Sequence, residues 1–162
     1  MEKLKEQLIV YLQENARYTI SQLASMLGCN EKEVENAIKD LENENVIVKY
    51  TAIINPEKMD SMGVDALIEV KVEPQKLKGF DAFAEQLCKF KEVKSLYLMS
   101  GVFDLAILVE GKNLNAVSKF VAEKLSAIDG VKSVATHFIM KKYKVEGQNT
   151  TVTESEKRQM SI

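Results

Sequence analysis

The sequence predicts an α+β protein in which a small helical domain precedes a duplicated strand–helix–strand domain. The first 45 residues show helical hydrophobic spacing interrupted by capping signals, and the rest contains two similar segments 39 residues apart. The chain has 162 residues, of which 46% are hydrophobic and 28% are charged. This length and composition suit one large or two small domains with packed cores.

Two short amphipathic helices are predicted first. From Leu4 to Leu12 the apolar residues recur at helical spacing. The second segment, TISQLASMLG, offers Thr19 as N-cap and Gln22 as its capping-box partner, and Gly28 ends it.

The third predicted helix repeats the same start signal. Asn30 is the N-cap, Glu33 is its capping-box partner, and Asn45 follows the last turn, where a left-handed cap is expected. Two short helices joined by a tight turn after a leading helix are typical of a helix-turn-helix unit of the winged type, predicted over residues 1–45.

A linker and a second domain are predicted after the helices. The stretch VIVKYTAIIN (46–55) is rich in β-branched residues, and Pro56 closes it, so a strand linker is predicted over 46–61. VDALIEV (64–70) resembles FDLAILV (103–109), and VKS recurs 38 residues after its first occurrence at 93–95.

A helical stretch lies between the members of each pair, at 80–90 and 114–128, and a tight Ser100-Gly101 hairpin joins the halves. This βαββαβ order predicts a ferredoxin-like domain over 62–145. With two helices on one face of the sheet, the other face is expected to pair in a homodimer. The polar tail, 146–162, is predicted to be mobile.

The charges are distributed unevenly. The net charge is −2, but residues 1–45 carry five basic and nine acidic side chains, and residues 62–145 carry thirteen basic and ten acidic ones. The predicted helix-turn-helix unit, a type of unit that commonly contacts DNA, is therefore the acidic segment, which counts against strong non-specific binding to DNA.

Several other functions find little support in the sequence. Neither a signal peptide nor a membrane span is predicted, and Cys29 and Cys88 lack metal or redox spacing, so a cytoplasmic protein is predicted. His137, the only histidine, is interpreted as a packing or hydrogen-bonding residue rather than a catalytic one. No metal and no cofactor are expected.

The third helix poses the main question, because its acidic residues also stabilise it. Glu31 and Glu33 lie in its first turn, where the helix dipole favours negative charge. One interpretation is an idle, solvated face. The favoured one is contact with double-stranded DNA through side chains that can pair with bases or phosphates. The predicted DNA-binding residues are Asn30, Lys32, Glu33, Asn36, Lys39 and Lys49.

In sequence, the chain resembles the leucine-responsive/asparagine-synthesis (Lrp/AsnC, feast/famine) transcription regulators over roughly residues 1–145. The resemblance rests on the order and spacing of QLA (22–24), DLENENVI, YTAIINPEKM, SGVFDL and GVKSVATHFIMKKYK. The chain departs from the family pattern at Ala37, where Arg is frequent, and at Asn45, where Gly is usual.

The resemblance implies dimers joined through the C-terminal sheets, commonly assembled to tetramers or octamers. It also implies an amino acid or similar effector bound where dimers meet. The effector-binding residues expected on this basis are Ser100, Gly101, Val102, Phe103, Asp104 and Thr136. The alternative for this segment is a plain hairpin in which Gly101 supplies a positive φ and Asp104 caps the turn.

The sequence therefore predicts a non-enzymatic transcription regulator that senses a small metabolite. One alternative is a metabolite-binding modulator without sequence-specific DNA binding, which the acidic head favours. A third interpretation, an enzyme like the sirohaem decarboxylase subunits, ranks lowest because MDSMGVDALIEV, after the linker, contains no His or Arg.

Overall fold

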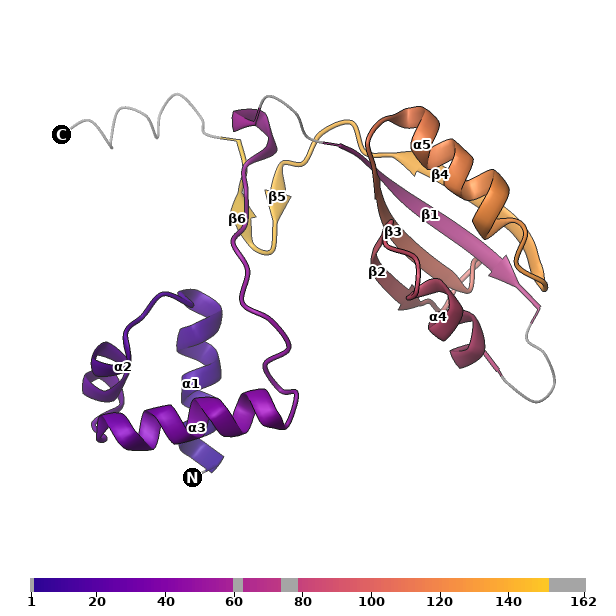
Figure 1. Cartoon of the computed structure of the whole chain (residues 1–162). Helices are drawn as coiled ribbons and strands as arrows, with labels where there is room; N and C mark the ends of the chain where they lie inside the picture. Colours follow the sequence, from indigo (N-terminus) through magenta and orange to yellow (C-terminus); the bar gives the residue numbers. More distant parts are fainter. Residues whose placement is uncertain (1, 60–62, 74–78, 152–162) are drawn as a thin grey trace. The chain divides into compact units, whose positions relative to one another are not determined.

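The computed structural model describes residues 2–59, 63–73 and 79–151. The chain divides into two compact units, residues 1–52 and 53–162 (Figure 1). The first unit, called the head below, consists of α1 (Glu2–Glu14), α2 (Ile20–Leu27) and α3 (Glu31–Asn43). Its core is made of the inward faces of the three helices: Leu8, Leu23, Ala24, Val34, Ala37 and Leu41.

Both predicted capping boxes form. The Thr19 hydroxyl accepts from the Gln22 backbone N–H at 3.2 Å, and Gln22 Oε1 accepts from the Thr19 backbone N–H at 2.9 Å. Asn30 and Glu33 exchange the same two bonds at 2.9 and 3.1 Å. Helices α2 and α3 therefore begin where the sequence predicts.

The end of α3 also follows the prediction. Asn45 has a φ of 55°, in the left-handed region. Its backbone N–H donates to the Glu42 carbonyl at 3.1 Å, and the Val46 N–H donates to the Leu41 carbonyl at 2.9 Å. These two bonds are those of a Schellman motif, so Asn45 takes the place of the glycine usual in such caps.

The predicted strand over 46–55 is not present, although the structure describes all of these residues. Val48 is 85% exposed, whereas Ile47 packs against the core of the head. A strand needs the backbone of a neighbouring strand to accept and donate its hydrogen bonds. No strand within the described ranges pairs with this segment, so it runs as an irregular connection to the short 3₁₀ helix η1 (Pro56–Lys58).

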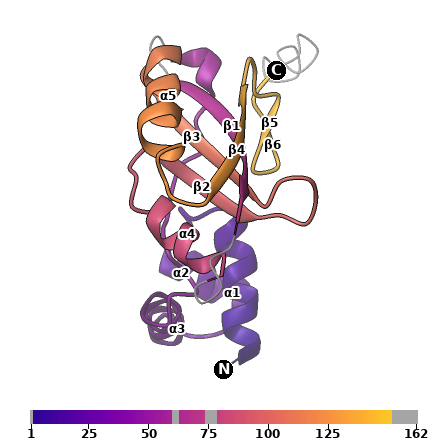
Figure 2. The same ribbon diagram turned by 90° about the vertical axis from the view of Figure 1, so that its right-hand side faces the viewer.

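The second unit contains the predicted βαββαβ arrangement. A four-stranded antiparallel sheet has the order β2-β3-β1-β4, which is the ferredoxin-like order. Its elements are β1 (Val64–Val72), α4 (Asp81–Leu87), β2 (Val93–Leu98), β3 (Leu105–Gly111), α5 (Leu114–Phe120) and β4 (Val131–Phe138). Figures 1 and 2 show α4 and α5 on the same face of the sheet.

The core of the second unit lies between the sheet and these two helices. Ile68, Ile107 and Val109 of the central strands pack with Phe83 of α4 and Phe120 of α5. The Asn113 side chain caps α5 by accepting from the Ala116 N–H at 2.9 Å. A π-helical turn, η2 (Val121–Leu125), continues α5 toward β4.

The other side of the sheet, called the open face below, carries no helix. Leu67 of β1 lies there beside Leu108 of β3 and His137 of β4, its direct partners in the sheet register. Leu67 is 38% exposed and Tyr97 of β2 is 56% exposed. The open face therefore offers apolar surface to a partner.

The tail was predicted to be mobile from residue 146, but its first residues are structured. Strands β5 (Lys144–Val145) and β6 (Gln148–Asn149) form a hairpin. Thr150 is 3% exposed, its hydroxyl donates to the Lys142 carbonyl, and its carbonyl accepts from Asn55 Nδ2 at 2.6 Å. The remainder of the predicted tail, 152–162, lies outside the described residues.

No helix in the described parts of the chain is both long enough and apolar enough to span a bilayer.

Candidate functional site

One side of α3 carries only basic and amide side chains. Residues at positions i, i+4, i+7 and i+11 of a helix lie above one another. Four exposed residues of α3 have this spacing and form the outward stripe: Lys32, Asn36, Lys39 and Asn43. The buried residues Val34, Ala37 and Leu41 lie on the opposite side of the helix.

The acidic residues of α3 lie on either side of the outward stripe, and those of its last turns are engaged elsewhere. Lys5 Nζ lies 3.4 Å from Asp40 Oδ2 and donates to Glu44 Oε1 at 2.8 Å. The Tyr50 hydroxyl donates to Glu42 Oε1 at 3.0 Å. Hydrogen bonding to Glu44 raises the pKa of Lys5, while burial and then Glu42 raise the pKa of Tyr50.

The predicted DNA-binding residues fall into two groups. Lys32, Asn36 and Lys39 lie on the outward stripe, and both lysines are free of ion pairs within the described chain. Asn30 and Glu33 also face solvent, but their side chains form the capping box of α3.

Two further exposed residues lie at the end of α3 and after it, Asn43 and Lys49. Lys49 lies outside the helix, on the exposed connection after it. Asn43 was missed by sequence reasoning, although its position four residues after Lys39 is the signal that would have identified it. Ala37 is 4% exposed, so its departure from the family pattern lies in the core rather than on the outward surface.

The second candidate segment is the loop of residues 99–104 between β2 and β3, called the β2–β3 loop. It is not the tight Ser100-Gly101 hairpin that was predicted, because six residues separate the strands. The Met99 N–H donates to the Asp104 carbonyl at 2.8 Å and closes the loop. Gly101 does not have a positive φ, and that prediction is wrong because the longer loop spreads the chain reversal over more residues.

Asp104 ties this loop to β1. Its Oδ2 accepts from the Val72 N–H at 2.9 Å, its Oδ1 accepts from Lys71 Nζ at 3.0 Å, and its own N–H donates to the Val70 carbonyl at 3.0 Å. The Val72 N–H, followed by Lys71, lowers the pKa of Asp104. A carboxylate with these partners stays charged and fixes the base of the loop.

The other predicted effector-binding residues are divided between two places. Ser100, Gly101 and Val102 are exposed at the loop, with Phe103 half-buried beside them. Thr136 lies on β4 opposite Ile68, whose side chain faces the helices, and β1 separates it from the loop. Within one chain, the structure therefore does not bring Thr136 and the β2–β3 loop together.

His137 has a hydrogen-bonding role on the open face. Its Nε2 lies 3.0 Å from Glu69 Oε2 on the adjacent strand β1. Among the described residues, no three His, Cys, Asp or Glu side chains gather in a way that could hold a metal ion.

Comparison with known proteins identifies a matching family for each of the two domains. The winged helix-turn-helix DNA-binding family matches residues 1–48, and the Lrp/AsnC ligand binding domain family matches residues 65–148. The chain is 43% identical to the HTH-type transcriptional regulator YugG of Bacillus subtilis, over 94% of this chain and 92% of that protein. It is 28% identical to the proline dehydrogenase transcriptional activator of Rhizobium radiobacter, over 84% of this chain and 86% of that protein.

Solved structures agree with these sequence relatives. The complex of the transcriptional regulator NMB0573 with L-Met, from Neisseria meningitidis, is 26% identical with a TM-score of 0.71, covering 94% of this chain and 96% of that one. AsnC of E. coli has a TM-score of 0.68 over 90% of this chain and 96% of that one, and at 18% identity it shows the shared fold.

These relatives are regulators, so the chain is not an enzyme and the interpretation as a sirohaem-decarboxylase-like protein is wrong. The chain belongs to the Lrp/AsnC family of transcriptional regulators, with a helix-turn-helix DNA-binding domain followed by the family's ligand-binding domain.

Proposed function

We propose that this regulator reads specific DNA sites through the outward stripe of α3. The stripe is the observation that carries the proposal, because Lys32 and Lys39 can contact phosphates while Asn36 and Asn43 can pair with base edges. The acidic side chains lie beside the stripe, and three of them already have partners within the head. The negative charge of the head then weakens non-specific binding without blocking base contacts.

The second part of the proposal is that the C-terminal domain senses an amino acid or a related small metabolite. The related NMB0573 regulator was crystallised with L-Met, which supports an amino acid as the class of effector here. The exposed backbone of Ser100, Gly101 and Val102 would bind its polar ends. Thr136 would contribute from a different chain of the assembly.

We further propose that the open face joins two chains into a dimer. Leu67 and Tyr97 on this face are exposed apolar side chains beside the half-buried Leu108. A dimer presents two heads to two DNA half-sites, and effector binding between dimers would change assembly or DNA affinity.

The test is fluorescence anisotropy of the full chain on DNA from upstream of its own gene, with scrambled DNA of the same composition as the control. Both DNAs are titrated at low and moderate salt, with and without a mixture of amino acids. A preference for the upstream fragment supports base reading, and a shift of that affinity by the mixture supports the proposed effector class.

Equal binding to both DNAs at every salt concentration would contradict the DNA-reading proposal. The remaining alternative would then be a metabolite-binding modulator without sequence-specific DNA binding, which the acidic head favours. If sequence preference is present but insensitive to all amino acids, only the proposed effector is wrong.

A further inference from the structure

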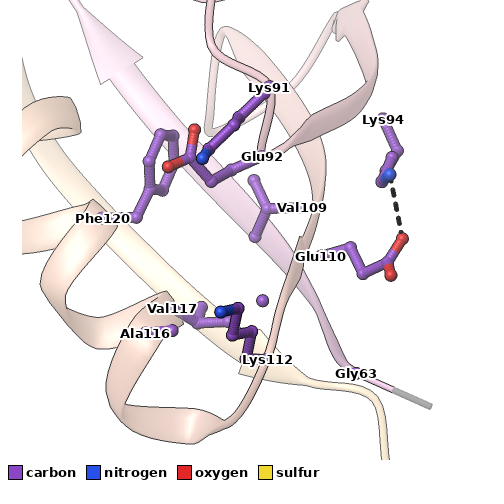
Figure 3. A pocket seen from close by; sticks show the side chains of 11 residues that line it. Gly63, Lys91, Glu92, Lys94, Val109, Glu110, Lys112, Ala116, Val117 and Phe120 are labelled. Atoms are coloured by element: carbon purple, nitrogen blue, oxygen red, sulfur yellow. Dashed lines mark ion pairs between the residues drawn. The ribbon is translucent and has the colours of Figure 1, made fainter.

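A pocket of about 590 Å³ lies at the end of the second unit where β3 leads into α5 (Figure 3). Val109 of β3 and Val117 and Phe120 of α5 form its apolar wall. All three side chains belong to the buried core, so the wall is fixed in place. Pockets that bind small molecules commonly have volumes of about 300–1,000 Å³ and mainly apolar linings.

A polar atom beside this wall has no hydrogen-bond partner among the described residues. Glu92 Oε1 accepts from Lys124 Nζ at 2.7 Å, but Glu92 Oε2 is buried and receives no hydrogen bond from the described residues. The bond from Lys124 lowers the pKa of Glu92, so the carboxylate is charged at neutral pH. A buried charged oxygen without a donor is costly, and such atoms usually have a protein, water or ligand partner.

The lysines around the pocket differ in their pairing. Lys94 lies 3.0 Å from Glu110 Oε2, whereas Lys91 and Lys112 form no ion pair with any residue in the described ranges. Figure 3 shows Lys91 and Lys112 toward opposite ends of the pocket, with Val109 between them. Two unpaired ammonium groups thus border the apolar wall and favour an anion.

We infer that this pocket binds a small carboxylate that also carries an N–H or O–H donor and an apolar group. The carboxylate would pair with Lys112 or Lys91, the donor would reach Glu92 Oε2, and the apolar group would lie on Phe120. Because Glu92 Oε2 is covered in the empty pocket, a side chain has to move aside. Lys91 is an exposed side chain drawn beside the Glu92 carboxylate in Figure 3, and its charge helps to lower the pKa of Glu92.

This site is separate from the β2–β3 loop proposed to bind the effector. Strand β2 begins beside the pocket and ends at the loop, and β3 returns from the loop to the pocket. Six residues of strand span about 20 Å at about 3.3 Å per residue. Occupation of the pocket is therefore a second binding event in the ligand-binding domain.

The test uses the full chain and the fluorescent probe 8-anilinonaphthalene-1-sulfonate, an apolar anion with one N–H donor. The displacing carboxylate is 4-hydroxyphenylacetate, which has an O–H donor and a ring. Ala116, a half-buried residue that lines the pocket, is replaced in Ala116→Leu to fill the space. This variant is expected to weaken the displaceable part of probe binding by about tenfold, because the added side chain occupies the volume the ring needs.

A second pair of variants tests the charge. Lys112→Ala removes one of the two unpaired ammonium groups and is expected to weaken binding of 4-hydroxyphenylacetate about threefold. The matched control is Lys119→Ala on α5, since Lys119 does not line the pocket and its ion pair with Glu123, at 3.8 Å, lies on the surface. The control is expected to bind like the wild type.

Circular dichroism establishes that each variant is folded. Unchanged binding in folded Ala116→Leu, or equal losses in Lys112→Ala and Lys119→Ala, would overturn the inference. Displacement of the probe by phenyl phosphate but not by 4-hydroxyphenylacetate would overturn the assignment to a carboxylate. DNA affinity of the same variants, measured in parallel, reports on the proposed function and not on the pocket.

Discussion

Asn45 shows how one side chain ends the third helix of the head. Its φ of 55° lies in a region that strains residues with a Cβ, and Asn tolerates it better than Ala does. We expect Asn45→Ala to lower the free energy of unfolding of the head by about 1 kcal/mol. Asn45→Gly is expected to keep or slightly raise it.

Urea denaturation followed by circular dichroism measures this difference. Asn43→Ala is the matched control, because Asn43 is exposed in the helical part of the same turn and its loss is expected to change stability by less than about 0.5 kcal/mol. Equal effects of the substitutions at 43 and 45 would show that the left-handed conformation is not the cause.

Asp104 makes a pH-dependent contribution to stability. The Val72 N–H and Lys71 lower its pKa in the folded chain, so the contribution is present in full above the pKa of the unfolded state and is lost as the pH falls through the folded value. We expect Asp104→Asn to be clearly less stable than the wild type at about pH 6, with the difference shrinking below about pH 4.

Urea midpoints across this pH range provide the measurement. Asp81→Asn, at an exposed position in the first turn of α4, is the control for a change of charge without the Val72 and Lys71 contacts. A stability difference between Asp104→Asn and the wild type that stays constant down to about pH 2 would contradict the role of the ionised carboxylate.

The lysine and asparagine side chains on the outward stripe of α3 are expected to affect DNA binding differently. Lys32→Ala is expected to weaken binding to upstream and scrambled DNA alike and to reduce the salt slope by about 1, because a phosphate contact carries no sequence information. Asn36→Ala is expected to reduce the preference for the upstream DNA by about 1–3 kcal/mol, the range for a bidentate base contact.

Anisotropy titrations of both DNAs over a range of salt separate these effects. Lys89→Ala, an exposed lysine of the second unit, controls for the change in net charge. If Asn36→Ala weakens binding to both DNAs equally, Asn36 is not a base-reading residue.

The same elements show which parts of the structure are local enough to predict from sequence. The caps of α2 and α3 depend on residues three positions apart, and both formed as predicted. The prediction of the repeated strands is also confirmed, because their hydrophobic pattern is a property of each segment alone. The stretch 46–55 has strand composition, but a strand depends on a partner that composition does not supply.

The candidate sites were less predictable, because they depend on register and on distant partners. The Asp104 carboxylate is bound by Lys71 and the Val72 N–H, more than thirty positions away in sequence, and no local pattern identifies them. Thr136 faces the helices because β4 pairs with β1 in the observed register, and a shift by one residue would turn it to the open face.

The acidic charge of the head makes the pairing of two heads in the proposed dimer important for DNA binding. Residues 1–45 carry five basic and nine acidic side chains, so a single head gains little from the DNA phosphates. Two heads held in one dimer bind the second half-site from a high effective concentration, which can raise affinity by about 10²–10⁴-fold. In the proposed dimer, specific binding by this acidic head would therefore depend on the open face as much as on α3.

Disruption of the open face is therefore expected to weaken DNA binding. Leu67→Lys combined with Leu108→Lys places two charges at adjacent positions of the open face, where Leu67 and Leu108 are direct partners in the sheet. We expect this double variant to be monomeric by size-exclusion chromatography with light scattering. Its affinity for the upstream DNA is expected to fall by about 10²-fold or more, although α3 is unchanged. Val10→Lys, at an exposed position of α1, adds one positive charge away from the sheet and should leave assembly intact. A folded monomer that retains the wild-type affinity would show that one head suffices, and in that case the acidic residues beside the outward stripe do not limit DNA binding.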